Sequence, residues 1–125
     1  WKVELKTVKE EPRHGQSKSD LMAAEADRIR KAIPKGSLLV TLDERGKDLT
    51  TVNFAKKLSA WQDSGESVAF VIGGTDGIDP ELKKESRMMI RLSSMTLPHA
   101  LARVILSEQI YRAWSILNNH PYHRA

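Results

Sequence analysis

Two short apolar runs with a helical pattern between them constrain this fold most strongly. The runs at 38–42 and 68–72 are continuous and aliphatic, which is typical of strands buried on both faces of a sheet. Between them, residues 49–61 carry apolar side chains at helical spacing and are followed by Ser64 and Gly65, which predicts an amphipathic helix. Such a unit has a right-handed crossover and parallel strands. The sequence therefore predicts an α/β fold with a largely parallel sheet flanked by helices.

The residues before this unit predict three further segments. Alternation of apolar and charged side chains indicates a strand over 2–8, with one face in contact with water. The charged, Gly- and Pro-containing stretch at 10–20 predicts a mobile loop. A helix is then expected from a cap at Ser19 to Ile33, because apolar residues recur at helical spacing in it.

The residues after the second apolar run complete the pattern. Asp79 and Pro80 predict a helix start, since aspartate caps helices and proline suits their first position. A short strand is expected over 92–97, and Pro98 opens a long helix that precedes a polar tail at 118–125. The apolar positions of the long helix indicate either core or a subunit contact, so a dimer is expected.

Length and composition narrow the class of protein. A chain of 125 residues is enough for one core, so we expect a single domain over residues 1–125. No apolar run approaches the roughly 20 residues that span a bilayer, which predicts no membrane segment. The absence of cysteine suits a cytoplasmic setting. The net charge of +4 weakly favours a polyanionic partner.

Known catalytic and phosphate-binding motifs are absent. The glycines at 73, 74 and 77 match neither G-x-G-x-x-G nor a P-loop, which disfavours a dinucleotide or ATP site. No G-x-S-x-G elbow is present, so classical hydrolase chemistry is also disfavoured. His120 and His123 stand at a metal-compatible spacing but have no third ligand nearby, and we therefore expect no metal.

Three loops are placed where a ligand would bind in a parallel sheet. Loops after the carboxyl ends of parallel strands converge at one edge of the sheet. Here the first loop follows Leu42 and includes a turn around Gly46, the second begins at Gly73, and the third runs over 93–98. The glycines allow backbone to approach a ligand closely. They are equally compatible with a tight strand-to-helix turn.

The tail at 118–124 combines an aromatic ring, a cation and imidazoles. Such a mixture can stack on a base and contact phosphate or a developing negative charge. It can also be an ordinary polar chain end. His99 can likewise be only a residue of the first helical turn.

Several segments together resemble one family. They are VTLD at 40–43, FVIGG at 70–74, LSSMTLPH at 92–99, EQIYRAWSI at 108–116 and NHPYHR at 119–124. In this combination and order the chain resembles the bacterial 23S (large-subunit) ribosomal RNA methyltransferases that act on pseudouridine N3, within the SPOUT superfamily. The resemblance covers the chain from about residue 1 to its end.

The resemblance implies a deep trefoil knot in the C-terminal part of the sheet and a homodimer with its active site between subunits. Family members usually begin with a further strand and helix, which this chain lacks. S-adenosylmethionine is the implied methyl donor. By position, its contacts fall on the three loops chosen above: Leu42, Gly74, Ser93, Ser94, Met95, Thr96, Leu97 and Pro98.

The implied activity is methylation of a pseudouridine in 23S rRNA, on the assembled large subunit or 70S ribosome, with no metal. A base or cation near N3 is required, and we expect His123 and Arg124 to act on it while Tyr122 positions the base. The family's tail often ends in an acidic residue where Ala125 stands here. The alternative is a non-catalytic RNA- or ribosome-binding module that retains the fold.

Overall fold

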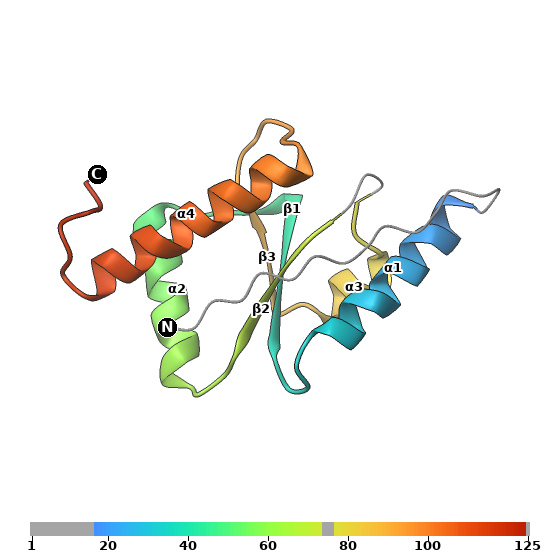
Figure 1. The fold of residues 1–125 in the computed structure, drawn as a ribbon, viewed down its shortest axis with the longest axis horizontal. Coiled ribbons are helices and arrows are strands. Elements are labelled where there is room, and N and C mark those ends of the chain that lie inside the picture. Colours follow the sequence, from blue (N-terminus) through green and yellow to red (C-terminus); the bar gives the residue numbers. More distant parts are fainter. Residues whose placement is uncertain (1–16, 74–76, 125) are drawn as a thin grey trace.

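The computed structural model describes residues 17–73 and 77–124. Within them the chain forms four helices and three strands (Figure 1). In chain order they are α1 (Lys18–Ala32), β1 (Leu38–Asp48), α2 (Thr51–Asp63), β2 (Val68–Ile72), α3 (Pro80–Glu85), β3 (Met88–Arg91) and α4 (His99–Leu117).

The described strands form one parallel sheet in the order β2-β1-β3. Strand β1 pairs with β2 over five residues in register, so that Leu38 lies opposite Val68 and Leu42 lies opposite Ile72. On its other side, Leu42 lies opposite Ile90 of β3. The predicted α/β class with a parallel sheet is therefore confirmed.

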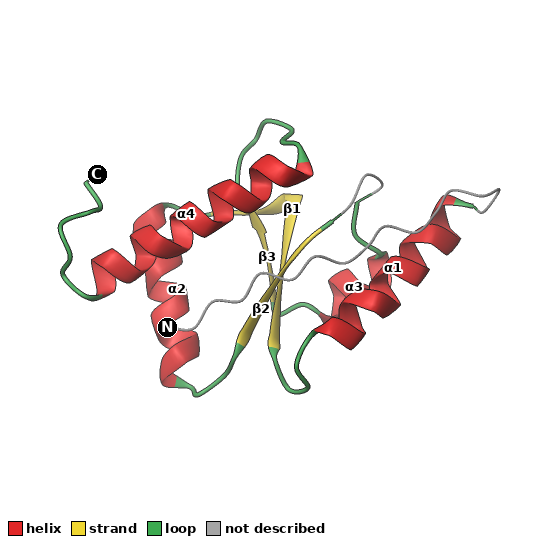
Figure 2. Ribbon diagram, in the orientation of Figure 1, coloured by secondary structure: helices red, strands yellow, loops and turns green. Residues whose placement is uncertain are grey.

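Helices cover both faces of the sheet (Figure 2). Alternate residues of β1 point to opposite faces, so Leu38, Val40 and Leu42 join a core with α2 and α4, which includes Phe54 and Leu106. Leu39 instead joins a second core with α1 and α3. That second core consists of Ala26, Ile29, Leu39, Val71, Ile78 and Leu82. The continuous apolar run at 38–42 is thus explained by burial on both faces.

Two expected boundaries at the carboxyl edge are wrong. The third strand is Met88–Arg91 rather than 92–97, because backbone pairing with β1 involves 88–91. The turn expected at Gly46 is instead part of β1, which continues to Asp48 and shifts register between Leu42 and Lys47. This irregular stretch brings Gly46 against β3.

Gly46 has no room for a side chain. A Cβ at this position would lie 2.7 Å from backbone atoms of Met89 and Ile90. The close approach of the two strands therefore requires glycine here.

Polar side chains define where the helices begin. Ser17, rather than the expected Ser19, caps α1 by accepting the Asp20 N–H. Thr50 caps α2 through the Asn53 N–H. These bonds satisfy amides that have no partner within the first helical turn.

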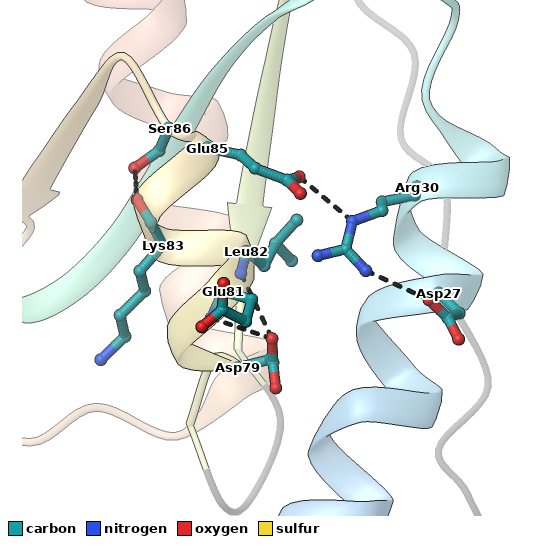
Figure 3. A network of polar contacts seen from close by, with 8 residues as sticks. All are labelled: Asp27, Arg30, Asp79, Glu81, Leu82, Lys83, Glu85 and Ser86. Carbon is teal, nitrogen blue, oxygen red and sulfur yellow. Dashed lines mark hydrogen bonds and ion pairs between the residues drawn. The ribbon is translucent and has the colours of Figure 1, made fainter.

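The short helix α3 is held at both ends (Figure 3). Asp79 accepts the N–H groups of Glu81 and Leu82, which confirms the predicted start at Asp79 and Pro80. Near the other end, Glu85 accepts a hydrogen bond from Arg30 of α1 at 3.1 Å. This bond links α3 to the helix beside it.

The strand predicted at 2–8 and most of the loop predicted at 10–20 lie outside the described residues; of that loop, residues 18–20 belong to α1. Among the helices that the structure describes, none is long and apolar enough to cross a membrane.

Candidate functional site

The carboxyl edge of the sheet brings Leu42 and two of the three predicted loops together. Leu42 lies opposite Ile72 and Ile90 in the strand pairing, and Gly73 and the 92–98 segment follow those two strands directly. Leu42 itself is buried. The first predicted loop is wrong, because the residues after Leu42 remain in β1 up to Asp48. The structure therefore places Leu42, within β1, beside the segments that follow β2 and β3, where a ligand could contact all three.

Asp43, directly after Leu42, connects this edge to α3. Lys83 Nζ lies 2.7 Å from Asp43 Oδ2, and the Arg45 N–H donates to Oδ1. Burial raises the pKa of the Asp43 carboxyl. Its bonds to Lys83 and the Arg45 amide, with the charges of both side chains, outweigh that effect and lower the pKa below its ordinary value. Asp43 therefore stays ionised at neutral pH and anchors the chain that follows Leu42.

His99 connects the second and third loops. Its Nδ1 lies 2.8 Å from the carbonyl oxygen of Gly73. Because a carbonyl oxygen only accepts, Nδ1 carries the proton and donates. A Cβ on Gly73 would lie 2.7 Å from Ile78 Cγ1 and 2.8 Å from the Gly77 carbonyl carbon, so the turn here is tight. His99 is thus more than a residue of the first helical turn.

The loop before α4 is the most open part of this edge. Ser93 Oγ accepts the Met95 N–H at 2.9 Å, which forms a local turn. Met95 exposes 75% of its surface, Ser94, Thr96 and Pro98 are also exposed, and Ser93 and Leu97 are half-buried. These residues are available to a ligand. Gly74, the remaining predicted contact, lies outside the described residues.

The tail folds back onto α4 through two polar contacts. The Tyr122 hydroxyl donates to Glu108 Oε1 at 3.1 Å, and Arg112 lies 3.3 Å from Nδ1 of His123. The bond to Glu108, followed by desolvation and the charge of that carboxylate, raises the pKa of Tyr122 above its ordinary value despite the opposing charge of Arg112. The phenol is therefore a hydrogen-bond donor at neutral pH. Arg124 is exposed.

Contacts between aromatic rings also hold the tail against α4. Tyr122 packs edge-on against Tyr111 with ring centroids 4.6 Å apart, and His120 lies 5.4 Å from Trp114. Tyr111 in turn stacks on Trp114. Such contacts add to burial alone, so in this structure the rings of His120 and Tyr122 lie against α4 while most of the tail stays exposed.

Within one chain, the tail is distant from the three loops. Tyr122 contacts Glu108, which follows His99 by nine residues. At about 1.5 Å per residue, this corresponds to about 14 Å along the helix axis. Figure 1 shows the tail beyond the end of α4 that is remote from the sheet edge. The two groups of predicted site residues are therefore not brought together in a single copy.

The described residues contain no group of three or more His, Asp or Glu side chains placed to hold a metal ion. His120 and His123 make other contacts: His120 accepts the Tyr122 N–H, and His123 faces Arg112.

A family model described as "Predicted SPOUT methyltransferase" matches residues 1–123. The chain belongs to the SPOUT methyltransferase family. This SPOUT methyltransferase is similar to proteins named "Ribosomal RNA large subunit methyltransferase H". It is 57% identical to those of Burkholderia ambifaria (strain MC40-6) and Burkholderia cenocepacia (strain J2315), over 99% of this chain and 80% of each relative. The Ralstonia pickettii (strain 12J) protein is 56% identical, over 98% of this chain and 80% of its own length. The resemblance inferred from sequence is confirmed.

Sequence reasoning missed three residues that organise the candidate site of this SPOUT methyltransferase, Lys83, Glu108 and Arg112, and left the role of His99 open. Lys83 holds Asp43, His99 holds Gly73, and Glu108 and Arg112 hold the tail. Only the spacing of Glu108 and Arg112, four residues apart on a helix, was a readable signal of an ion pair. The other partners come from distant parts of the chain.

Proposed function

We propose that this SPOUT methyltransferase transfers the methyl group of S-adenosylmethionine to N3 of a pseudouridine in 23S rRNA, in the cytoplasm and on the assembled ribosome. The support is the name of its relatives, which match almost the whole chain at 56–57% identity. The choice of pseudouridine N3 rests on the family resemblance of the five motifs between residues 40 and 124 in combination. A deep trefoil knot in the C-terminal part is a further element of the proposal.

The carboxyl edge of the sheet fits a ligand such as S-adenosylmethionine. The half-buried Leu97 offers apolar surface, and Ser94, Met95 and Thr96, which precede it, are exposed. Glycine at 73 lets the backbone turn without a side chain in the way. Adenosine-type ligands generally bind in apolar sites with a few polar groups of this kind.

The tail would act on the nucleotide. Bound S-adenosylmethionine would supply an electrophilic methyl carbon to N3, with S-adenosylhomocysteine as the leaving group and the N3 proton passing to water. The negative charge that develops on the base needs a nearby donor or cation. His123 and Arg124 are the proposed groups, and Tyr122 offers a ring and a hydroxyl to position the base.

The proposed active site combines the loops of one copy with the tail of another. Reacting atoms must come within about 3–3.5 Å, which the tail of the same chain does not reach. On α4, Leu101, Val104 and Tyr111 expose 45%, 64% and 44% of their surface and follow one another at helical spacing. We propose that a second copy covers this stripe in a symmetric homodimer over residues 1–125, each chain forming a single domain.

Methyl transfer into intact ribosomes, isolated 50S subunits, free 23S rRNA and tRNA, followed by mass spectrometry of the nucleosides, tests this function. We expect methylated pseudouridine from ribosomes and much less from free RNA. A methylated product at another nucleoside would show that pseudouridine N3 is not the target. Binding to ribosomes without any methylated product would favour the non-catalytic module.

Co-expression of two inactive variants tests the shared site. One variant carries Arg124→Ala in the tail and the other Thr96→Arg in the exposed loop before α4. In mixed dimers one site has both intact parts, so about a quarter of the wild-type activity should return if the copies mix at random. No recovery, with mixed dimers demonstrated by two affinity tags, would place loops and tail of the same chain in one site.

A further inference from the structure

We propose that Arg112, held by Glu108, is a positioning residue that fixes the tautomer of His123. In this arrangement His123 presents its Nε2–H as a hydrogen-bond donor to the anionic base, and does not act as the acceptor of the N3 proton. The inference rests on the proposed function and deepens it by assigning the chemical role of one side chain.

The tautomer follows from the contact between the two side chains. The Arg112 guanidinium lies 3.3 Å from Nδ1 of His123. A guanidinium has only donors, so Nδ1 must be the accepting nitrogen, and the neutral ring then carries its proton on Nε2. The half-buried His123 therefore has one nitrogen committed to Arg112 and the other available as a donor.

Arg112 is itself fixed from two sides. Its Nε donates to Glu108 Oε1, one turn earlier on α4. Its guanidinium carbon lies 5.0 Å from the ring centroid of Tyr122, a cation–π contact. One guanidinium thus orients both Tyr122 and His123, the two aromatic members of the proposed catalytic set.

Glu108 connects this arrangement to the body of the protein. Besides Arg112, Oε1 accepts the Tyr122 hydroxyl, and Oε2 accepts from Gln109 at 3.2 Å. Gln109 in turn accepts a hydrogen bond of 2.7 Å from Thr51 of α2. The tail is therefore tied to two packed helices, which is the kind of support that holds a reacting group in a productive orientation.

The Nε2–H suits the charge that the reaction creates. Loss of the N3 proton leaves a negative charge shared between N3 and the two neighbouring carbonyl oxygens, and the proton passes to water. An imidazole N–H aimed at one of these oxygens stabilises the anion as N3 forms its bond to the methyl carbon. Arg124 adds a positive charge from the same segment.

The state of His123 is measurable without substrate. Long-range ¹H–¹⁵N correlation spectra of the labelled protein distinguish the two neutral tautomers, and a His123→Ala spectrum assigns the signal. We expect Nε2–H in the wild type and a mixture of both forms in Arg112→Met. An Nδ1–H form in the wild type, or an unchanged spectrum in Arg112→Met, would overturn the proposal.

Kinetics test whether Arg112 acts through His123. Arg112→Met should lower kcat by about tenfold or more, as expected for the loss of a charge-assisted hydrogen bond, and leave the KM for S-adenosylmethionine within about twofold. In a His123→Ala background, the same substitution should cost less than about twofold, because coupled residues are not additive. Additive losses would contradict the proposal.

A matched control is available on α1. Arg30 makes an ion pair with Glu85 at 3.1 Å, away from the tail, and Arg30→Met removes it without altering either half of the proposed site. This variant should keep the wild-type kcat and the wild-type His123 spectrum. If the wild-type chain transfers no methyl group, the proposed function is refuted. The role of Arg112 is decided by the His123 spectra alone, so failure of the proposed function and failure of the tautomer proposal are distinguishable.

Discussion

Nδ1 of His99 lies 2.8 Å from the carbonyl oxygen of Gly73, so the first turn of α4 is bonded to the residue that follows β2. The two residues are 26 positions apart in sequence. Gly73 begins one loop of the proposed cofactor site, and His99 directly follows the other, at 93–98. Because the imidazole donates this bond in its Nδ1–H form, the contact can be removed or imitated by substitution.

His99→Ala should weaken binding of S-adenosylmethionine, while His99→Asn should bind close to wild type. The asparagine amide nitrogen occupies nearly the position of Nδ1 and donates the same bond, whereas alanine leaves the Gly73 carbonyl without its partner. A single hydrogen bond of this kind corresponds to a change in Kd of about two- to tenfold. Calorimetric titration measures it. Equal weakening in both variants would show that the ring, and not the bond, matters.

Gly46→Ala should destabilise the fold strongly, and more than Gly65→Ala. The added Cβ would meet backbone of β3 at 2.7 Å, which cannot move aside as a side chain would. We expect a loss of about 3 kcal/mol in the free energy of unfolding, at the upper end for overpacking. Urea denaturation followed by circular dichroism measures it.

Gly65→Ala is the matched control. Gly65 has a φ of +76°, but nothing lies within 4 Å of its position for Cβ. Only backbone strain of about 1 kcal/mol is then expected. A loss at Gly46 no larger than at Gly65 would contradict the close approach of β1 and β3.

The parallel sheet, with the segments at 73 and 92–98 meeting at its carboxyl edge, could be predicted from sequence. The runs at 38–42 and 68–72 are apolar on both faces, and both faces are indeed covered by helices. The start of α3 could be predicted because Asp79 and Pro80 act within one helical turn. These features depend on neighbouring residues.

Features that depend on contacts between distant residues were missed. Met88–Arg91 is a strand because it pairs with β1, and no local alternation marks it as one. The turn expected at Gly46 was wrong because glycine there serves a close approach between strands, which looks the same in sequence as a turn. Likewise, nothing near His99 or Lys83 in sequence reveals Gly73 or Asp43 as their partners.

Asp43→Asn should destabilise the protein at neutral pH and have little effect in acid. The folded-state pKa of Asp43 lies below its ordinary value, because the bonds to Lys83 and the Arg45 amide outweigh the effect of burial. Its carboxylate therefore contributes stability above the unfolded pKa of about 3.9, and this contribution is lost as the pH falls through the folded pKa.

Urea unfolding of the wild type and Asp43→Asn at a series of pH values measures this difference. At pH 7 we expect about 1.5–3 kcal/mol in favour of the wild type, the range for a hydrogen bond to a charged group. The difference should shrink as the pH falls below about 4. Glu81→Gln, which breaks the exposed pair with Lys84, is the control and should change little at any pH. A difference independent of pH would contradict the ionised pair.

Removal of Glu108 should lower the pKa of Tyr122 towards its ordinary value of about 10. The carboxylate accepts the phenolic hydrogen and repels the phenolate, and both effects favour the protonated ring. Because the chain has two tyrosines, a Tyr111→Phe background leaves Tyr122 as the one that titrates. Ultraviolet absorbance of the phenolate as a function of pH then reports it. Glu108→Ala should show the larger decrease and Glu108→Gln, which keeps an acceptor oxygen, a smaller one. An unchanged titration in Glu108→Ala would mean that the tail does not rest on α4 in solution.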